Sequence, residues 1–182
     1  MKHSPTLVIA AACAVTVLLR VIDNPVANVS GLGALALLCG SVLRHPAAVL
    51  IPLAVRAATD TIIELRTGSG FYESWWFDYA AYAVIFSVGR FVRRRHYGSV
   101  LTGALTSAAV FFFVSNFGVW AAWPETYAHT LAGLIDCYTK AIPFARGTFL
   151  GDVVLSLVFF SAWNLLTVPV GEEQPVHTSG AA

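Results

Sequence analysis

Long apolar blocks separated by short polar loops are the feature that most constrains this chain of 182 residues. Hydrophobic residues make up 57% of the chain and charged residues only 12%, whereas soluble domains carry about 25% charged residues. A helix needs about 20 mostly apolar residues to cross the ~30 Å hydrocarbon core of a bilayer. We therefore expect an all-α, integral membrane protein and not a soluble domain.

The blocks predict six membrane spans, separated by polar or proline-containing turns. The second span is short and rich in Gly, Ala and Ser, which let helices approach each other closely. The expected spans are Thr6–Ile22, Leu32–Leu43, Ala47–Leu65, Trp75–Val92, Ser99–Trp123 and Thr148–Val168. Residues 1–170 would then form one transmembrane domain, and the polar segment 171–182 a disordered cytoplasmic tail.

Basic residues predict the orientation of these spans. The arginine cluster at 90–95 lies between the fourth and fifth spans, and such clusters favour the cytoplasmic side. An even number of spans then places both termini in the cytoplasm, as expected for a multi-pass protein of a bacterial inner membrane. Lys2 before an apolar run through Cys13 would also fit a secretory signal, but the run continues to Val21, which favours a span.

The segment between the fifth and sixth spans is expected to form a separate amphipathic helix, Thr126–Ile142, on the outer surface. Asp136 and Lys140 stand four residues apart with the acid first, the better order for a helical ion pair. Pro124 and Pro143 delimit the segment. Its apolar positions recur at helical spacing: Leu131, Leu134, Ile135, Tyr138 and Ile142. Two interpretations stay open, a helix resting on lipid and a lid over an outward-facing cavity.

Several ionisable side chains lie inside the predicted spans, where each costs roughly 2.5–3.5 kcal/mol on insertion scales. Arg56, Asp60 and Glu64 follow each other at four-residue spacing on one helical face. They could form a buried network that fixes helix register, or converge near the outer end to bind a solute. For the second possibility, the candidate solute-binding residues are Asp60, Glu64, Asn116, Trp120, Tyr127, His129, Asp136 and Asp152.

Motifs of several catalytic classes are missing from the sequence. It has no Walker A motif, no HExxH zinc motif and no GxSxG nucleophile elbow. Cys13, Cys39 and Cys137 show no CxxC spacing, which favours packing roles. A net charge of +1 gives no indication of nucleic-acid binding. We expect no enzymatic activity, no cofactor and no metal site, and partners limited to lipid, membrane proteins and a small solute.

Several stretches resemble a family of uncharacterised small bacterial membrane proteins, which are themselves similar to the substrate-binding S-components of energy-coupling-factor transporters. The resemblance covers most of the chain from the second span to the sixth. At 128–129 this chain departs from the family pattern, because it has Ala128 and His129 where the family usually has Pro and a basic residue. The matching stretches are 31–37, 115–120, 130–134, 137–138, 142–144 and 150–152.

The resemblance implies a six-helix fold that captures a small, vitamin-like solute from outside. It also implies two partners, a transmembrane coupling subunit and an ATPase module that drive release of the solute. The competing interpretation is a membrane interaction or scaffold protein without a solute, in which the polar residues only hold helices together. An intramembrane enzyme is a third, which would need a nucleophile paired with a base inside the bundle.

Overall fold

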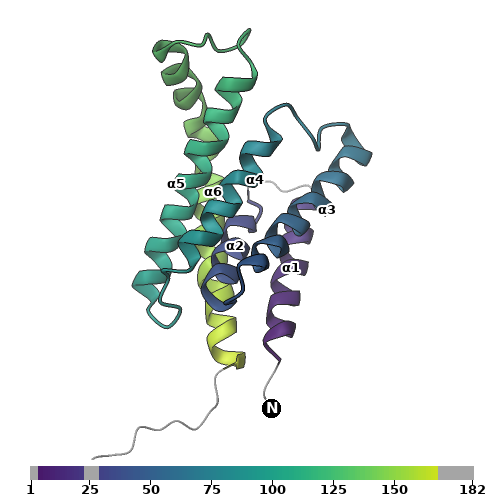
Figure 1. The fold of residues 1–182 in the computed structure, drawn as a ribbon, viewed down its shortest axis with the longest axis vertical. Helices are drawn as coiled ribbons and strands as arrows, with labels where there is room; N and C mark the ends of the chain where they lie inside the picture. Colours follow the sequence, from purple (N-terminus) through teal and green to yellow (C-terminus); the bar gives the residue numbers. More distant parts are fainter. Residues whose placement is uncertain (1–3, 23–28, 168–182) are drawn as a thin grey trace, which may run out of the picture.

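The computed structural model describes residues 4–22 and 29–167, and these form α-helices and one 3₁₀ turn without any strand (Figure 1). The expected all-α class is confirmed for this part of the chain, whereas the predicted tail at 171–182 lies outside it. The elements are α1 (Pro5–Val21), α2 (Leu32–Val42), η1 (Pro46–Val49), α3 (Leu50–Thr67), α4 (Trp75–Gly89), α5 (Tyr97–Ala122) and α6 (Leu131–Thr167).

Local sequence signals explain where helices begin and end. At the start of α1, the Ser4 hydroxyl accepts a hydrogen bond from the backbone N–H of Thr6 at 3.3 Å, and Pro5 occupies the first turn. At the end of α3, Gly68 adopts φ 70°, a left-handed conformation that glycine reaches without steric cost. These caps satisfy backbone groups that the helices themselves leave unpaired.

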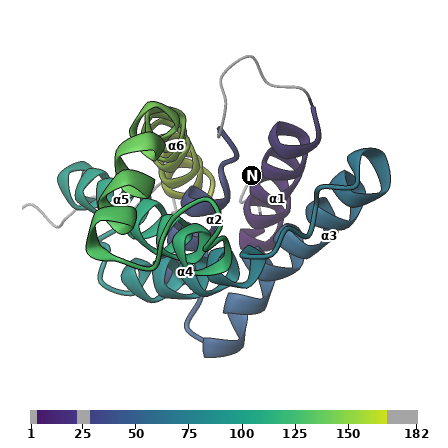
Figure 2. The same ribbon diagram turned by 90° about the horizontal axis from the view of Figure 1, so that it is seen from above.

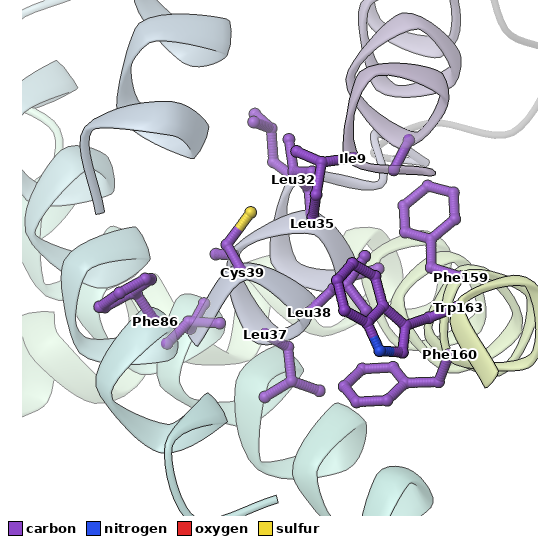
Figure 3. Packing of buried hydrophobic residues seen from close by; sticks show 14 of the residues in the cluster. Ile9, Leu32, Leu35, Leu37, Leu38, Cys39, Phe86, Phe159, Phe160 and Trp163 are labelled. Atoms are coloured by element: carbon purple, nitrogen blue, oxygen red, sulfur yellow. The ribbon is translucent and has the colours of Figure 1, made fainter. Parts of the chain in front are cut away.

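Helix α2 lies at the centre of the bundle, with α1 and α3 on one side and α4, α5 and α6 on the other (Figure 2). Every residue from 32 to 40 is buried. A helix that is apolar all round suits such a position, because no face of it needs to meet solvent. Figure 3 shows Leu35 and Leu38 of this helix in one apolar cluster with Phe160 and Trp163 of α6.

Glycines set the distance between α2 and α4. A Cβ atom added at Gly40 would lie 1.9 Å from the carbonyl oxygen of Phe86, and one added at Gly89 would lie 2.4 Å from the carbonyl oxygen of Leu37. Both distances are far below van der Waals contact. The two backbones therefore approach at a point where only glycine fits, as in small-residue interfaces of membrane helices.

Helix α6 corrects one expectation from the sequence. The outer helix predicted at 126–142 and the sixth span predicted at 148–168 are one helix of 37 residues, which begins at Leu131 and continues through Pro143. A proline inside a helix costs about 3 kcal/mol. Ending the helix there would free several backbone groups, each costing several kcal/mol in apolar surroundings. Packing against α5 on one side further favours a continuous helix.

Two helices, α5 and α6, are long and apolar enough to cross a membrane by length and composition. Helices α1 and α2 are apolar but shorter. By this criterion, two of the six expected spans are supported. At ~1.5 Å per residue, α6 is about 55 Å long, and its first half forms with α5 a hairpin that extends beyond the other helices at the top of Figure 1.

The described helices have two distinct ends (Figure 1). The start of α1, the end of α6 and the arginine-containing turn after α4 lie together at the bottom of the view. The α3–α4 loop and the α5–α6 turn lie toward the top. The described loops therefore form two groups at opposite ends of the bundle.

Candidate functional site

A buried network of charged side chains joins α1, α3 and α4. Arg20 Nη2, in the last turn of α1, lies 2.6 Å from Asp60 Oδ1, and its Nε donates to Thr59 Oγ1 at 2.8 Å. Arg56 Nε lies 2.7 Å from Asp60 Oδ2. Arg56 Nη2 lies 3.0 Å from Asp78 Oδ2, in the first turn of α4. Alternating charges thus tie together three helices that are distant in the sequence.

Tyrosines surround this network. Tyr79 donates a hydrogen bond to Asp60 Oδ2 at 3.0 Å, and Tyr72, on the α3–α4 loop, donates to the carboxylate of Asp78. Burial, and after it the negative charge of Asp78, raises the pKa of Tyr72 to about 12. This hydroxyl therefore stays protonated near neutral pH and remains a donor. The Tyr82 ring lies 5.9 Å from the Arg56 guanidinium carbon, within cation–π range.

The four charges of the network balance. Arg20 and Arg56 supply two positive charges, and Asp60 and Asp78 two negative ones. The most exposed of these side chains, Arg20, is only 12% exposed. Removing a charge from water costs several kcal/mol, so such groups persist in a protein interior only when they are paired and hydrogen-bonded.

A cavity of about 220 Å³ lies against this network, and we call it the inner cavity. It is bounded by residues of five helices, by Ser30 in the segment before α2 and by the α3–α4 loop. Both polar and apolar groups face it. Its lining consists of Arg20, Ser30, Arg56, Tyr72, Asp78, Tyr82, Phe111, Thr148 and Asp152.

A larger cavity of about 470 Å³, the outer cavity, adjoins the inner one. Tyr72, Asp78, Phe111 and Thr148 line both, so the two are neighbouring parts of one hollow. The remaining lining comes mainly from α5 and α6 and includes aromatic rings, an amide and an amine: Phe112, Ser115, Asn116, Val119, Tyr127, Cys137, Lys140, Ala141, Phe144 and Ala145. Its volume falls in the ~300–1,000 Å³ range of small-molecule sites.

Asp152 of α6 also lines the inner cavity and is 4% exposed. Its carboxylate lies against the backbone of α2: a Cβ atom added at Gly33 would lie 2.2 Å from Asp152 Oδ2. The backbone amide of Ala34 interacts with the same carboxylate. The glycine is therefore what allows this buried acid to reach the central helix.

The structure brings together half of the candidate residues expected from the sequence. Asn116, Tyr127 and Asp152 line the connected cavities. Asp60 lies directly behind the inner cavity, 2.7 Å from Arg56, which does line it. The Asn116 side-chain amide donates to the carbonyl of Phe112 at 2.7 Å.

The other four candidates do not line the cavities and make other contacts, although Asp136 lies next to the outer cavity through its pair with Lys140. Glu64 accepts hydrogen bonds from the backbone of the α3–α4 loop, at 2.7 Å from Gly70 N. Trp120 and His129 hold the α5–α6 turn, with Trp120 Nε1 donating to the Ala128 carbonyl at 3.0 Å and His129 Nε2 3.1 Å from the Trp120 carbonyl. Asp136 pairs with Lys140 at 2.7 Å on the exposed face of α6, the ion pair expected from their spacing.

Most of the residues that line the cavities were not among the candidates expected from the sequence, and Arg20, Asp78, Lys140, Tyr72 and Phe111 are examples. Arg20 carried a usable signal, because a charge near the end of an apolar block is costly unless it is paired. Lys140 is expected on the outer amphipathic helix as the ion-pair partner of Asp136, and Asp78 falls near the outer start of the expected span Trp75–Val92; neither is a candidate for solute binding. Tyr72 and Phe111 gave no signal, since tyrosine and phenylalanine are common at membrane interfaces and in cores. Within residues 4–22 and 29–167, no group of three His, Cys, Asp or Glu side chains could hold a metal ion.

A family model described as a family of unknown function (DUF6580) matches residues 2–174. No curated protein and no solved structure matches the chain.

Proposed function

Because this chain belongs to a family of unknown function, we propose its role from its own geometry: a multi-pass membrane protein that captures a small solute in the cavity between its helices. The observation that carries the proposal is the pair of connected cavities with polar groups at the inner end and mostly apolar walls toward the outer end. Small-molecule sites combine an apolar lining with a few polar groups that orient the ligand.

The surfaces of the two longest helices support a membrane setting. Only 28% of the apolar stretch of α5 and 33% of that of α6 is buried inside the protein. Large apolar side chains are exposed along both helices, among them Leu105, Phe113, Leu150, Val154 and Val158. Contiguous apolar surface on this scale is typical of proteins that face lipid. In the proposal the shorter helices α1 to α4 also lie within the bilayer and complete the bundle.

Charge placement supports an orientation. The turn after α4 contains the arginines of 90–95, and the α5–α6 turn, near Tyr127 and the outer cavity, lies at the opposite end. Under the positive-inside rule the arginine end faces the cytoplasm, the outer cavity opens to the external side and both termini are cytoplasmic. For a bacterial inner membrane, such a site would capture a solute from the periplasm.

Resemblance to the S-components of energy-coupling-factor transporters supports uptake as the purpose of capture. In that comparison the chain would bind the solute and a transmembrane coupling subunit with an ATPase module would drive its release inward. This step of the proposal is fold-level analogy, and it adds no bond-making chemistry to the chain itself.

Native mass spectrometry of the purified protein tests solute capture. The expected result is a retained small molecule in the wild type and reduced retention in Asn116→Ala and Asp152→Asn, which change one polar group in each cavity. Glu125→Gln is the matched control, because Glu125 is an exposed carboxylate in the α5–α6 turn. Wild-type-like retention in both cavity variants would remove these residues from the site.

One observation favours the scaffold alternative. The Arg20 and Arg56 charges are already neutralised by Asp60 and Asp78, so the network needs no ligand to be stable. If the chain is only a scaffold, no small molecule is retained, and the cavity variants change thermal stability without changing any bound mass. Co-purification with an ATPase module would instead favour transport.

A further inference from the structure

Asp152 differs from the other buried acids of the bundle. No ion pair joins it to a Lys, Arg or His side chain anywhere in the described ranges 4–22 and 29–167. Asp60 and Asp78, in contrast, each pair with an arginine at 3.0 Å or less. The walls of the inner cavity and the network behind it thus contain two paired acids and one acid without a cationic partner.

The sum of the charges around the inner cavity therefore favours a positively charged ligand. Arg20 and Arg56 offset Asp60 and Asp78 one to one, so an ionised Asp152 leaves the region with one excess negative charge. A buried carboxylate is costly without a counter-charge. A cation bound in the inner cavity would supply that charge, whereas an anion would add to the imbalance.

Aromatic rings form a second wall suited to a cation. Tyr82 and Phe111 line the inner cavity and stack with ring centroids 5.2 Å apart at an interplanar angle of 28°. Positively charged groups are attracted to the faces of such rings, most strongly where water is excluded. Tyr82 is buried, and Thr148, which also lines the cavity, can accept a hydrogen bond from an N–H group.

We infer that the solute of this cavity is a compact organic cation whose protonated nitrogen binds between the Asp152 carboxylate and the ring of Phe111. This inference rests on the proposed solute-binding function and specifies the charge class of the solute. An organic cation fits better than a metal ion, because no three acidic, His or Cys side chains gather in the described part of the chain. The inner cavity, at about 220 Å³, is smaller than the ~300–1,000 Å³ pockets of drug-sized ligands, so the cationic group must be compact.

Three probes of similar size and different charge test this. Benzylamine is a cation at neutral pH, benzyl alcohol is neutral and benzoate is an anion. Their binding is measured as the concentration-dependent rise in the unfolding temperature of the full chain in lipid nanodiscs, a shift that follows ligand occupancy. We expect benzylamine to stabilise the protein at millimolar concentration and the other two probes to have little effect.

Substitutions of residues that line the inner cavity test whether benzylamine binds there. Asp152→Asn, which keeps shape and removes charge, is expected to raise the Kd of benzylamine about tenfold or more. Asp152→Glu keeps the charge and should retain part of the binding, and Phe111→Leu should weaken it through loss of the ring. Glu125→Gln should bind as the wild type does. If Asp152→Asn does not fold, the test rests on benzylamine binding by the other two variants, which should be weakened in Phe111→Leu and partly retained in Asp152→Glu.

Two outcomes would overturn the inference. Stabilisation by benzoate or benzyl alcohol equal to or above that by benzylamine would show a solute cavity of another charge class, and the proposed function would stand. No stabilisation by benzylamine, or equal stabilisation of Asp152→Asn and wild type, would show that Asp152 is an uncharged packing group. In that case, retention of a native solute in mass spectrometry still decides the proposed function independently.

Discussion

At the scale of single residues, Arg56 is the point where the charge network meets the cavity. It contacts both Asp60 and Asp78, and it also lines the inner cavity. A guanidinium presents donors in a rigid fork and so can bind two carboxylates at once. The network therefore fixes the position of one cavity wall relative to three helices.

Asp60→Asn tests the structural part of this role. The substitution leaves Arg20 without its carboxylate partner and removes one of two from Arg56. Breaking a buried pair from one side typically costs about 3–5 kcal/mol, so we expect a marked fall in the unfolding temperature of the protein in nanodiscs. Asp136→Asn is the control, because its ion pair with Lys140 is exposed on α6. Equal unfolding temperatures for the two variants would contradict a stabilising network.

Tyr72 gives the network a predictable pH dependence. Its pKa in the folded state, about 12, lies above the ordinary value of 10.0, so folding favours the protonated form. The stability that this group contributes is full below pH 10.0 and is lost as pH rises toward about 12. Tyr72→Phe, which also removes a buried hydrogen bond, should cost about 1–3 kcal/mol near neutral pH.

The measurement compares wild type and Tyr72→Phe by thermal unfolding across this pH range. Because the variant lacks the titrating group, its stability deficit should shrink between pH 10.0 and about 12. A deficit that stays constant over the whole range would show that ionisation of Tyr72 is not coupled to folding. Other tyrosines titrate in both proteins and largely cancel in the difference.

At the scale of the elements, α2 organises the bundle through its small residues. Gly40→Ala would place a Cβ atom 1.9 Å from the Phe86 carbonyl oxygen, so α2 and α4 would have to separate. Overpacking of this kind typically costs about 1–3 kcal/mol, seen as a lower unfolding temperature. Gly98→Ala is the matched control, because a Cβ there meets nothing within 4 Å. A similar loss in both variants would argue against a close crossing of α2 and α4.

The helices were largely predictable from the sequence, with one exception at Pro143 of α6. Apolar blocks of sufficient length indicated α1 to α5 to within a few residues, because hydrophobic length and turn residues carry that information. Pro143 was expected to end a helix. It does not, because the backbone on both sides stays hydrogen-bonded and α5 packs against it, and neither effect is visible in a local pattern.

The candidate site was predictable only in part. Asp60, Asn116 and Asp152 could be predicted as candidates because a polar side chain inside an apolar block costs free energy unless it has a partner or a function. That Glu64 instead binds the α3–α4 loop backbone depends on a turn with Gly70, whose geometry the sequence does not specify. Tyr72 reaches Asp78 across the start of α4, a contact that only the folded arrangement of loop and helix creates.

At the scale of the whole molecule, the described helices separate a basic end from an end with the cavities. In the proposed account the apolar surface between them lies in lipid, and the outer cavity is reached from the external side. Both parts of the account depend on one property, the orientation of the bundle in the membrane. If the bundle were inverted, the cavity would open toward the cytoplasm and solute capture from outside would be impossible.

Labelling from one side of the membrane measures this orientation directly. Glu125→Cys, in the α5–α6 turn, and Arg94→Cys, in the arginine cluster, are introduced separately into a chain in which Cys13, Cys39 and Cys137 are replaced by Ala. A membrane-impermeant maleimide is then applied from the periplasmic side. The account predicts labelling of Glu125→Cys in intact cells and of Arg94→Cys only after the inner membrane is opened. Labelling of Arg94→Cys in intact cells, with Glu125→Cys protected, would contradict it.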